Sequence, residues 1–406
     1  MKLAKFPESM TLVCLIIGPM VALITLSLDI YAPSLPSMAR ALSSTTVQAQ
    51  LTMTAYTLAM GLGQLVSGPL SDRFGRRKAA MLAMLIYTLA SIFCSIAQDV
   101  SVLITARILQ GLAASAAVVT AFAIIRDKYE GQEAAKGFGI LSSATTLGTI
   151  VGPIIGGLLQ QHFASFRAAF VALSVFGTVS LFVALLFVED TSSGKAPSHF
   201  GQILKNYRDI VLDSHLMSYS LFSTASVLLF FTLSSISPFI LIEQYHVSQA
   251  MYGVAFSTCA LMFTIGALCA NKFIDRLGSH RSILVGTSFM LLGSLTMLLA
   301  NLFIEKNAIT FIVPSWLLFW GVAFCFGPSI SLAMQKYKSI SGSASAVLAC
   351  IRYGVGSVIG TLFLSFCVPS SVHLSWFFMC VSVILVMVAW SKNSTQKRRV
   401  LQKSHG

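Results

Sequence analysis

The feature that most constrains this chain is a series of twelve apolar runs, each long enough to cross a lipid bilayer. They occupy residues 10–32, 49–71, 79–98, 101–125, 137–161, 168–188, 214–242, 248–271, 282–304, 308–335, 343–368 and 374–391. A transmembrane helix needs about 20 predominantly apolar residues. Only 10% of the residues are charged, whereas soluble domains carry roughly 25%. The sequence therefore predicts an all-α membrane protein with twelve transmembrane helices.

The lysines and arginines indicate on which side each loop lies. With the N-terminus in the cytoplasm, 22 of the 27 basic residues fall in cytoplasmic segments, and only Arg40, Arg167 and Lys306 fall in outer loops. Such a bias is typical of membrane proteins. It predicts a multi-pass membrane protein with both termini in the cytoplasm. It also explains the net charge of +13 without nucleic acid as a partner.

A short charged sequence occurs twice, half a chain apart. Residues 68–78 (GPLSDRFGRRK) follow the second run, and a weaker copy at residues 271–281 (NKFIDRLGSHR) follows the eighth. Asp72 and Asp275, in the shared order Asp-Arg-x-Gly, are 203 residues apart in a chain of 406. Such a repeat indicates two homologous halves. We expect two pseudo-symmetric six-helix bundles at 1–188 and 214–391, a cytoplasmic linker at 189–213 and a basic tail at 392–406.

Asp29 is the only acid well inside a predicted span. Ionisable groups in the membrane usually face a partner or an aqueous cavity, although an interfacial position is the alternative. Asp29 lies about 8 Å, and Arg107 about 9 Å, from the outer ends of their helices. An Asp29–Arg107 pair is therefore geometrically possible, while an unpaired Arg107 would instead extend to the interface. Gln110 and Gly111, one turn further on, favour the inward orientation.

A second arginine, Arg352, lies roughly 14 Å into the eleventh run, near the membrane midplane. No acid of the second half lies at comparable depth. Arg352 either faces a central cavity, which we favour, or bonds to backbone carbonyls near Gly354 and Gly356. Aromatic residues are further candidate substrate contacts, although such residues more often simply pack: Tyr31, Tyr56, Trp320 and Tyr353.

The fifth run carries glycines at every fourth position, Gly148, Gly152 and Gly156, with Pro153 and Gly157 beside them. They form a flat stripe suited to close helix contact. Elsewhere, the eight cysteines fall within or at the ends of runs and form no CxxC pair, so we expect no disulfide and no metal site. We find no phosphate-binding P-loop and no nucleophile–base arrangement, and we expect neither a cofactor nor enzymatic activity.

These motifs together resemble the major facilitator superfamily over nearly the whole chain. Residues 68–78 match its signature between helices 2 and 3, and Arg107 with Gln110 and Gly111 matches its helix-4 motif. Residues 148–157 match the helix-5 motif of drug:proton antiporters. Asp29-Ile30-Tyr31-x-Pro33-x-x-Pro36 resembles the bicyclomycin/chloramphenicol-resistance branch of the twelve-helix antiporters. The resemblance implies two bundles that rock about a central site, and we expect a monomer.

The resemblance also implies a conformational switch. Asp72 would face the N-terminus of helix 11, and Arg73 would pair with an acid at the end of helix 4, for which Asp127 is the candidate. The residues assigned to this switch are Gly68, Asp72, Arg73, Gly75, Arg76, Asp127, Gly148, Gly152, Pro153, Gly156 and Gly157.

The leading functional hypothesis is proton-driven export of drug-like small molecules. Asp29 would exchange protons, Arg107 would stabilise its charged form, and proton and substrate would compete for the site. The alternative is a narrow-specificity transporter, exporting or importing an anionic or zwitterionic metabolite or a carboxylate siderophore, because two membrane arginines oppose one acid. A sensor or scaffold that moves nothing would not need the glycine stripe and the charged hinge.

Overall fold

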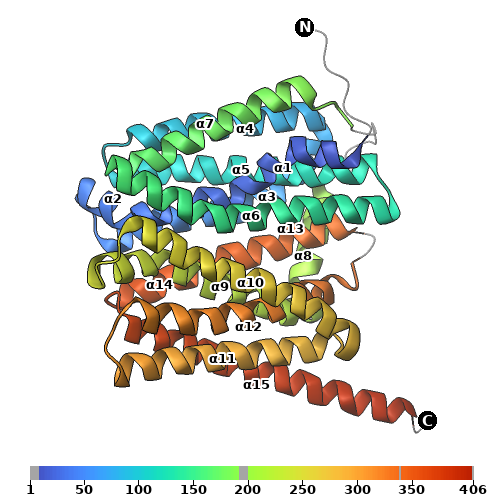
Figure 1. Ribbon diagram of the computed structural model, residues 1–406. Helices are drawn as coiled ribbons and strands as arrows, with labels where there is room; N and C mark the ends of the chain where they lie inside the picture. Colours follow the sequence, from blue (N-terminus) through green and yellow to red (C-terminus); the bar gives the residue numbers. More distant parts are fainter. Residues whose placement is uncertain (1–8, 192–199, 338–339, 405–406) are drawn as a thin grey trace.

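The computed structural model describes residues 9–191, 200–337 and 340–404, in which long helices run side by side (Figure 1). No β-strand occurs within these ranges. The first helix begins and the last helix ends at the same end of the molecule, which we call the terminal end; the opposite one is the far end. Lys2, Lys5, residues 192–199 of the predicted linker and the last two residues of the predicted tail lie outside the described residues.

The helices of the first half are α1 (Met10–Asp29), η1 (Ala32–Ser34), α2 (Leu35–Ala41), α3 (Thr46–Phe74), α4 (Arg76–Ile96), α5 (Val100–Lys128), α6 (Gly131–Phe163) and α7 (Arg167–Phe187). Those that follow are α8 (Phe200–Leu212), α9 (Ser214–Pro238), η2 (Phe239–Gln244), α10 (Gln249–Leu277), α11 (Ser279–Phe303), α12 (Ala308–Met334), α13 (Ser341–Cys350), η4 (Ile351–Val355), α14 (Gly356–Phe366) and α15 (Ser371–Ser404).

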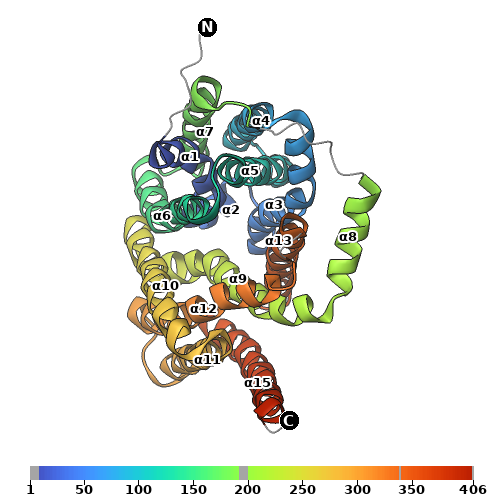
Figure 2. The same cartoon turned by 90° about the vertical axis from the view of Figure 1, so that its right-hand side faces the viewer.

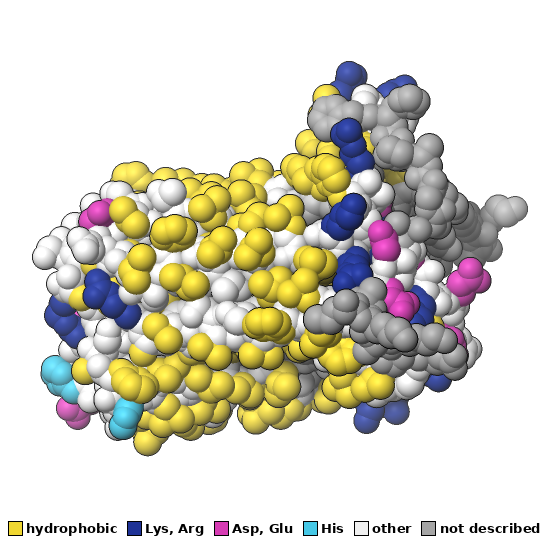
Figure 3. Space-filling view, turned by 90° about the horizontal axis from the view of Figure 1, so that it is seen from above, with side chains coloured by type: hydrophobic (Ala, Val, Ile, Leu, Met, Phe, Trp, Pro, Cys, Tyr) yellow, Lys and Arg dark blue, Asp and Glu magenta, His cyan; other side chains and the backbone are white. Residues whose placement is uncertain are grey.

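Eleven helical segments among the described residues are long and apolar enough to cross a membrane. Each coincides with one of the predicted runs. The remaining predicted run, 49–71, lies within α3, a 29-residue helix that also carries glutamine, threonine and serine. On the face shown in Figure 3, apolar side chains cover the middle of the molecule, and most of the visible lysines and arginines lie toward the terminal end. The prediction of an all-α, multi-pass membrane protein is therefore confirmed.

Helices that are close in sequence also lie together in space (Figure 2). Helices α1–α7 form one group and α9–α15 form another. Across the seam between them, α3 contacts α13, η4 and α14, while α6 contacts α10. The predicted linker contains the amphipathic helix α8, where the Tyr207 hydroxyl donates to the carbonyl of Leu65 at 2.7 Å. This bond fastens the linker to α3.

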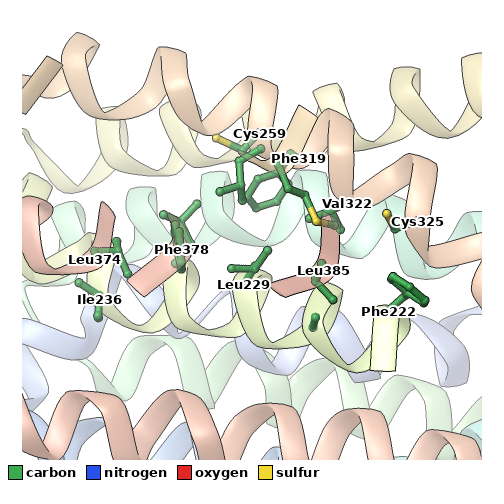
Figure 4. Packing of buried hydrophobic residues seen from close by; sticks show 14 of the residues in the cluster. Phe222, Leu229, Ile236, Cys259, Phe319, Val322, Cys325, Leu374, Phe378 and Leu385 are labelled. Carbon is green, nitrogen blue, oxygen red and sulfur yellow. The ribbon is translucent and has the colours of Figure 1, made fainter. Parts of the chain in front are cut away.

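The second group packs around a core to which α9, α10, α12 and α15 contribute (Figure 4). Its side chains include Leu229 on α9, Phe319 on α12 and Phe378 on α15, each less than 2% exposed. Lipid is as apolar as these side chains, so the helices associate through close packing rather than escape from water. A Cβ on Gly321 of α12 would lie 2.5 Å from the carbonyl oxygen of Gly286 on α11, which shows how closely those helices cross.

Two spans of the second group contain π-helical turns. One, η2, follows Pro238 at the end of α9. The other, η4, interrupts the eleventh span between α13 and α14 and contains Arg352. The sequence predicts one span at 343–368 with a disruption at Gly354 and Gly356, and η4 contains Gly354. π-Turns within helices occur frequently at functional sites.

Candidate functional site

The last residue of α1, Asp29, is an acid enclosed by protein. Asp29 is 1% exposed, and neither of its carboxylate oxygens has a hydrogen-bond partner. The Thr149 hydroxyl on α6 faces the carboxyl but donates to the carbonyl of Thr145 at 3.2 Å instead. Asp29 is thus surrounded by other helices and does not lie at an exposed interface.

The glycine stripe of α6 allows α1 to approach so closely. A Cβ at Gly152 would lie 2.9 Å from the Cβ of Asp29, and one at Gly156 would lie 2.1 Å from the carbonyl oxygen of Ile30. One at Gly148 would meet the Thr25 hydroxyl at 2.6 Å. Side chains larger than hydrogen do not fit at these distances. The stripe therefore makes a close helix contact, and its partner is the helix that carries Asp29.

Arg107 on α5 is fully buried but does not pair with Asp29. Its Nη1 donates to the carbonyl of Ser27 at 3.2 Å and to Oε1 of Gln110 at 2.5 Å. Its Nε donates to the carbonyl of Thr52 at 3.3 Å. The Asp29–Arg107 pair that we considered possible is therefore absent: Nε and Nη1 bond to carbonyls and an amide oxygen, and Nη2 is buried without a partner. The interfacial alternative is also wrong, since the side chain is 0% exposed.

Three aromatic rings lie around the Arg107 guanidinium. The distances from Cζ to the ring centres are 4.3 Å for Tyr56, 5.3 Å for Tyr31 and 5.8 Å for Phe170. Cation–π attraction is strongest where the cation is desolvated, as here. The Tyr31 hydroxyl bonds to the Thr52 hydroxyl at 3.1 Å, and the Tyr56 hydroxyl donates to two carbonyls of α1. Both tyrosines, predicted as substrate contacts, support Arg107 in this conformation.

Gln110 and Gly111 hold the arginine in place. The Gln110 amide donates to the Ser91 hydroxyl on α4 at 2.8 Å, while its oxygen accepts from Arg107. A Cβ at Gly111 would lie 2.3 Å from the Tyr56 carbonyl oxygen, so α5 can approach α3 only with glycine there. The supporting residues Ser27, Thr52, Ser91 and Phe170 did not stand out in the sequence, because single hydroxyl and aromatic residues are common in apolar runs.

The charged turn between α3 and α4 forms a cluster around Arg76. The Arg76 guanidinium contacts Asp72 at 2.5 Å and Asp127, near the end of α5, at 2.7 Å. The prediction that Arg73 pairs with Asp127 is thus wrong. Arg73 is exposed, and its Cζ lies 5.8 Å from the centre of the Phe74 ring. Arg76 takes its place because it begins α4 with its side chain buried between α3 and α5.

The same turn is fixed by its backbone. Gly75 has a φ of +89°, and a Cβ there would lie 2.2 Å from a carboxylate oxygen of Asp190. That carboxylate accepts from the Arg76 backbone nitrogen at 3.0 Å. Asp72, expected to face the start of the eleventh span, instead pairs within its own group of helices.

In the second group, Arg352 lies between two rings. Its Cζ is 4.8 Å from the ring centre of Tyr353 and 5.3 Å from that of Phe326 on α12. Its Nε is buried without a partner, so bonding to backbone carbonyls, the alternative that we considered, is not what the described structure shows. The predicted contact Trp320 stacks on Phe324, with ring centres 6.5 Å apart.

The two groups of helices are joined along α6 and α10. The Ser257 hydroxyl donates to the Ile150 carbonyl at 2.6 Å, and a Cβ on Gly253 would lie 2.2 Å from the Pro153 carbonyl oxygen. One on Gly157 would lie 2.3 Å from the carbonyl oxygen of Gln249. Pro153 and Gly157 thus face the second group, whereas the stripe on α6 faces α1.

Further bonds join the two groups elsewhere. The hydroxyls of Thr54 on α3 and Thr361 on α14 are hydrogen-bonded. At the far end, Arg40 forms a 2.6 Å ion pair with Glu243. A pocket of about 460 Å³ opens beside this pair and contains none of the predicted site residues; its lining is Ser37, Arg40, Ala41, Gln160, Gln161, Ala164 and Gln249.

Comparison with known proteins identifies the family. Residues 17–361 match the model of the Major Facilitator Superfamily. The chain is 29% identical over 399 residues to a chloramphenicol resistance protein of Pseudomonas aeruginosa, covering 98% of this chain and 94% of that one. It is 23% identical over 374 residues to a bicyclomycin resistance protein homolog of Haemophilus influenzae, covering 89% and 91%. It is 24% identical over 335 residues to the multidrug resistance protein MdtL of Klebsiella pneumoniae, covering 82% of each.

Solved structures share the fold. A D-xylose–proton symporter superposes with a TM-score of 0.75 at 14% identity, covering 93% of this chain and 96% of that one. A bacterial homolog of the lysosomal transporter Spinster, inward-facing and unoccupied, superposes with a TM-score of 0.72 at 15% identity, covering 94% and 95%. The chain therefore belongs to the Major Facilitator Superfamily, as a transporter rather than an enzyme, and the names of its relatives support the drug-efflux branch.

Proposed function

We propose that this transporter exports drug-like small molecules across the bacterial inner membrane in exchange for protons. The names of its relatives, which refer to chloramphenicol, bicyclomycin and multidrug resistance, support drug export. The observation that carries the proton-coupling part is Asp29, an enclosed acid whose carboxylate oxygens have no donor. Export in exchange for protons needs a group that changes its charge once in each cycle, and Asp29 fits that requirement.

The surroundings of Asp29 favour its neutral form in this conformation. An ionised carboxylate in a low-dielectric interior is costly unless a cation or several donors stabilise it. Arg107 makes its bonds elsewhere, and the ionisable groups that interact with Asp29 from α3 and α10 are Tyr56 and Tyr252, neither of which supplies a cation. Deprotonation therefore calls for a second conformation in which Asp29 meets water or Arg107.

Alternating access provides that second conformation. Three contacts join the two halves, and one of them lies at the far end. They link Ile150 with Ser257, Thr54 with Thr361 and, at the far end, Arg40 with Glu243. We assign the far end to the periplasm and the terminal end, where basic residues gather, to the cytoplasm. Separation of these contacts would expose Asp29 to the outer side, where it would exchange protons.

The moving bodies would be two six-helix bundles, residues 1–188 and 214–391, joined by the cytoplasmic linker 189–213 in a monomer. The cluster of Arg76 with Asp72 and Asp127 would hold one conformation, together with the turn glycines Gly68 and Gly75. The Arg76 and Asp127 side chains are 5% and 15% exposed, whereas Asp72 is 49% exposed, so the Arg76–Asp127 contact is the better shielded from solvent. The exposed Arg73 would add to the positive charge of the cytoplasmic face.

Ethidium transport into energised inverted vesicles tests this function. Wild-type protein should move ethidium only when a pH gradient is present, and Asp29→Asn should abolish gradient-driven movement while the protein remains in the membrane. Asp209→Asn, which alters an exposed acid on α8, is the matched control and should behave as wild type. Normal gradient-driven transport by Asp29→Asn would refute the coupling role of Asp29.

A further inference from the structure

The π-turn η4 presents an arginine that the transport mechanism above does not use. A π-turn adds a residue to one helical turn, so it displaces side chains from the register of the flanking helices α13 and α14. Arg352 lies at this displacement, and its guanidinium contacts the rings of Tyr353 and Phe326. Such contacts supply cation–π attraction but no hydrogen-bond acceptor for the N–H groups of the guanidinium.

No protein acceptor satisfies this guanidinium among the described residues. Its Nε is buried and unpaired, and neither an ion pair nor a hydrogen bond links Arg352 to the described chain. An intramembrane arginine is costly, and usually pairs with an acid or carbonyls or faces an aqueous cavity. Arg107 in the same molecule makes three bonds to oxygen atoms and leaves only its Nη2 unpaired. Arg352 lacks such bonds within the described ranges.

Two residues close in sequence to the contacts of Arg352 are open rather than packed. Gly327 follows Phe326 on α12, is exposed, and a Cβ built there meets no atom within 4 Å. Val355, one turn beyond Arg352 within η4, is 44% exposed.

The same residues lie at the seam between the two halves. The Cβ of Tyr353 would lie 3.4 Å from a Cβ on Gly61 of α3, and the Tyr353 ring packs against the core of the first group. A ligand bound at Arg352 would therefore lie close to both halves, so movement of the halves would change its surroundings.

We propose that Arg352 binds the carboxylate of amphiphilic aromatic anions. A guanidinium edge matches a carboxylate through two parallel hydrogen bonds, and the rings of Phe326 and Tyr353 provide apolar surface for an aromatic body. This proposal names a substrate class for the exporter. Its role in the cell rests on the proposed export function. Neutral and cationic compounds would not need Arg352.

Equilibrium binding separates this proposal from the transport proposal, because it needs no gradient. The probes are radiolabelled 2-naphthoate and its uncharged counterpart 2-naphthamide, added to the purified full-length protein in detergent. We expect wild type to bind naphthoate at least tenfold more tightly than naphthamide. Arg352→Gln should lose that preference, Arg352→Lys should retain part of it, and Arg208→Gln, at an exposed arginine of α8, should keep it.

Ethidium binding serves as the folding control, since a correctly folded Arg352→Gln variant should bind it as wild type does. Equal affinity for naphthoate in wild type and Arg352→Gln, or no preference for naphthoate in a wild-type protein that binds ethidium, would overturn the proposal. If Asp29→Asn still carries out gradient-driven transport while Arg352→Gln loses naphthoate, proton coupling through Asp29 fails and the anion site stands.

Discussion

The guanidinium of Arg107 lies 4.3 Å from the centre of the Tyr56 ring, and both residues are fully buried. The same guanidinium bonds to carbonyls of α1 and α3 and to the Gln110 amide oxygen, so it is held in this conformation without a carboxylate partner. Under the function proposed above, Asp29 is the group whose charge changes during the cycle, and it would approach Arg107 only in another conformation.

Even a conservative substitution of Arg107 should lower the stability of the protein. Arg107→Lys keeps the charge but loses the planar fork that reaches Thr52, Ser27 and Gln110 together. Unpaired buried acceptors should lower the free energy of unfolding by about 1–3 kcal/mol. Thermal unfolding in detergent measures the effect, with the exposed Arg208→Lys as control. Equal melting temperatures for Arg107→Lys and wild type would contradict the bonding described.

The glycine stripe gives a sharp steric prediction. Gly156→Ala places a methyl group 2.1 Å from the Ile30 carbonyl oxygen and must move α1 away from α6, whereas at Gly139 on the same helix nothing lies within 4 Å. We expect Gly156→Ala to reduce ethidium transport at least tenfold and Gly139→Ala to leave it unchanged. Expression level and transport rate are measured together. A fully active Gly156→Ala protein would mean that α1 and α6 need not pack closely.

Crosslinking tests whether the seam must open. In a background without the eight native cysteines, Thr54→Cys with Thr361→Cys joins the two halves where their hydroxyls are bonded. Oxidation should stop transport, and reduction should restore it. The control pair, Ser67→Cys with Ser115→Cys, joins α3 and α5 within one half, where the hydroxyls lie 3.1 Å apart. Transport that persists after complete crosslinking of the first pair would exclude separation of the halves there.

Stability at low pH should depend on Asp213, which precedes α9 outside the membrane spans. The Tyr337 hydroxyl donates to this carboxylate at 2.5 Å and, with the Lys336 charge and a backbone donor, lowers the pKa of Asp213 below its ordinary value of 3.8. Because the folded-state pKa is depressed, the stabilisation is complete above the unfolded-state value. It is lost as the pH falls through the lower folded-state pKa.

Removal of this bond should therefore destabilise the protein most at neutral pH. We expect Tyr337→Phe to lower the free energy of unfolding by ~1 kcal/mol at pH 7, with the difference from wild type shrinking on the acid side of pH 4. Melting temperatures between pH 3 and pH 7 provide the measurement. A difference that grows toward low pH would have the wrong sign and would argue against a depressed pKa.

The fold was accessible from sequence because a bilayer imposes length and polarity on every span. The runs, the basic loops and the glycine stripe follow from those constraints. Side-chain partners did not follow. Asp29 and Arg107 were placed at nearly equal depth along their helices, but depth says nothing about the direction in which a side chain points around the helix axis. Asp29 therefore lies beside Thr149, whereas Arg107 bonds to Gln110.

Other features could be predicted only in part. Asp127 accepts from Arg76 instead of Arg73 because the turn at Gly75 decides which of several neighbouring arginines is buried. The π-turn at Arg352 lies beside Gly354 and Gly356, where the sequence indicated a disruption but not its form. The helix α8 lies in a segment whose mixed polarity predicted a linker, and its amphipathic pattern was too short to stand out.

Drug-induced proton movement tests the central claim most directly. Respiring inverted vesicles hold an acidic interior, and addition of chloramphenicol, which is uncharged, should release protons from vesicles that contain the wild-type protein. Asp29→Glu should retain some release, and Asp29→Asn should show none while remaining folded in the membrane. Release by Asp29→Asn at the wild-type rate would show that protons cross by another route and would contradict the account.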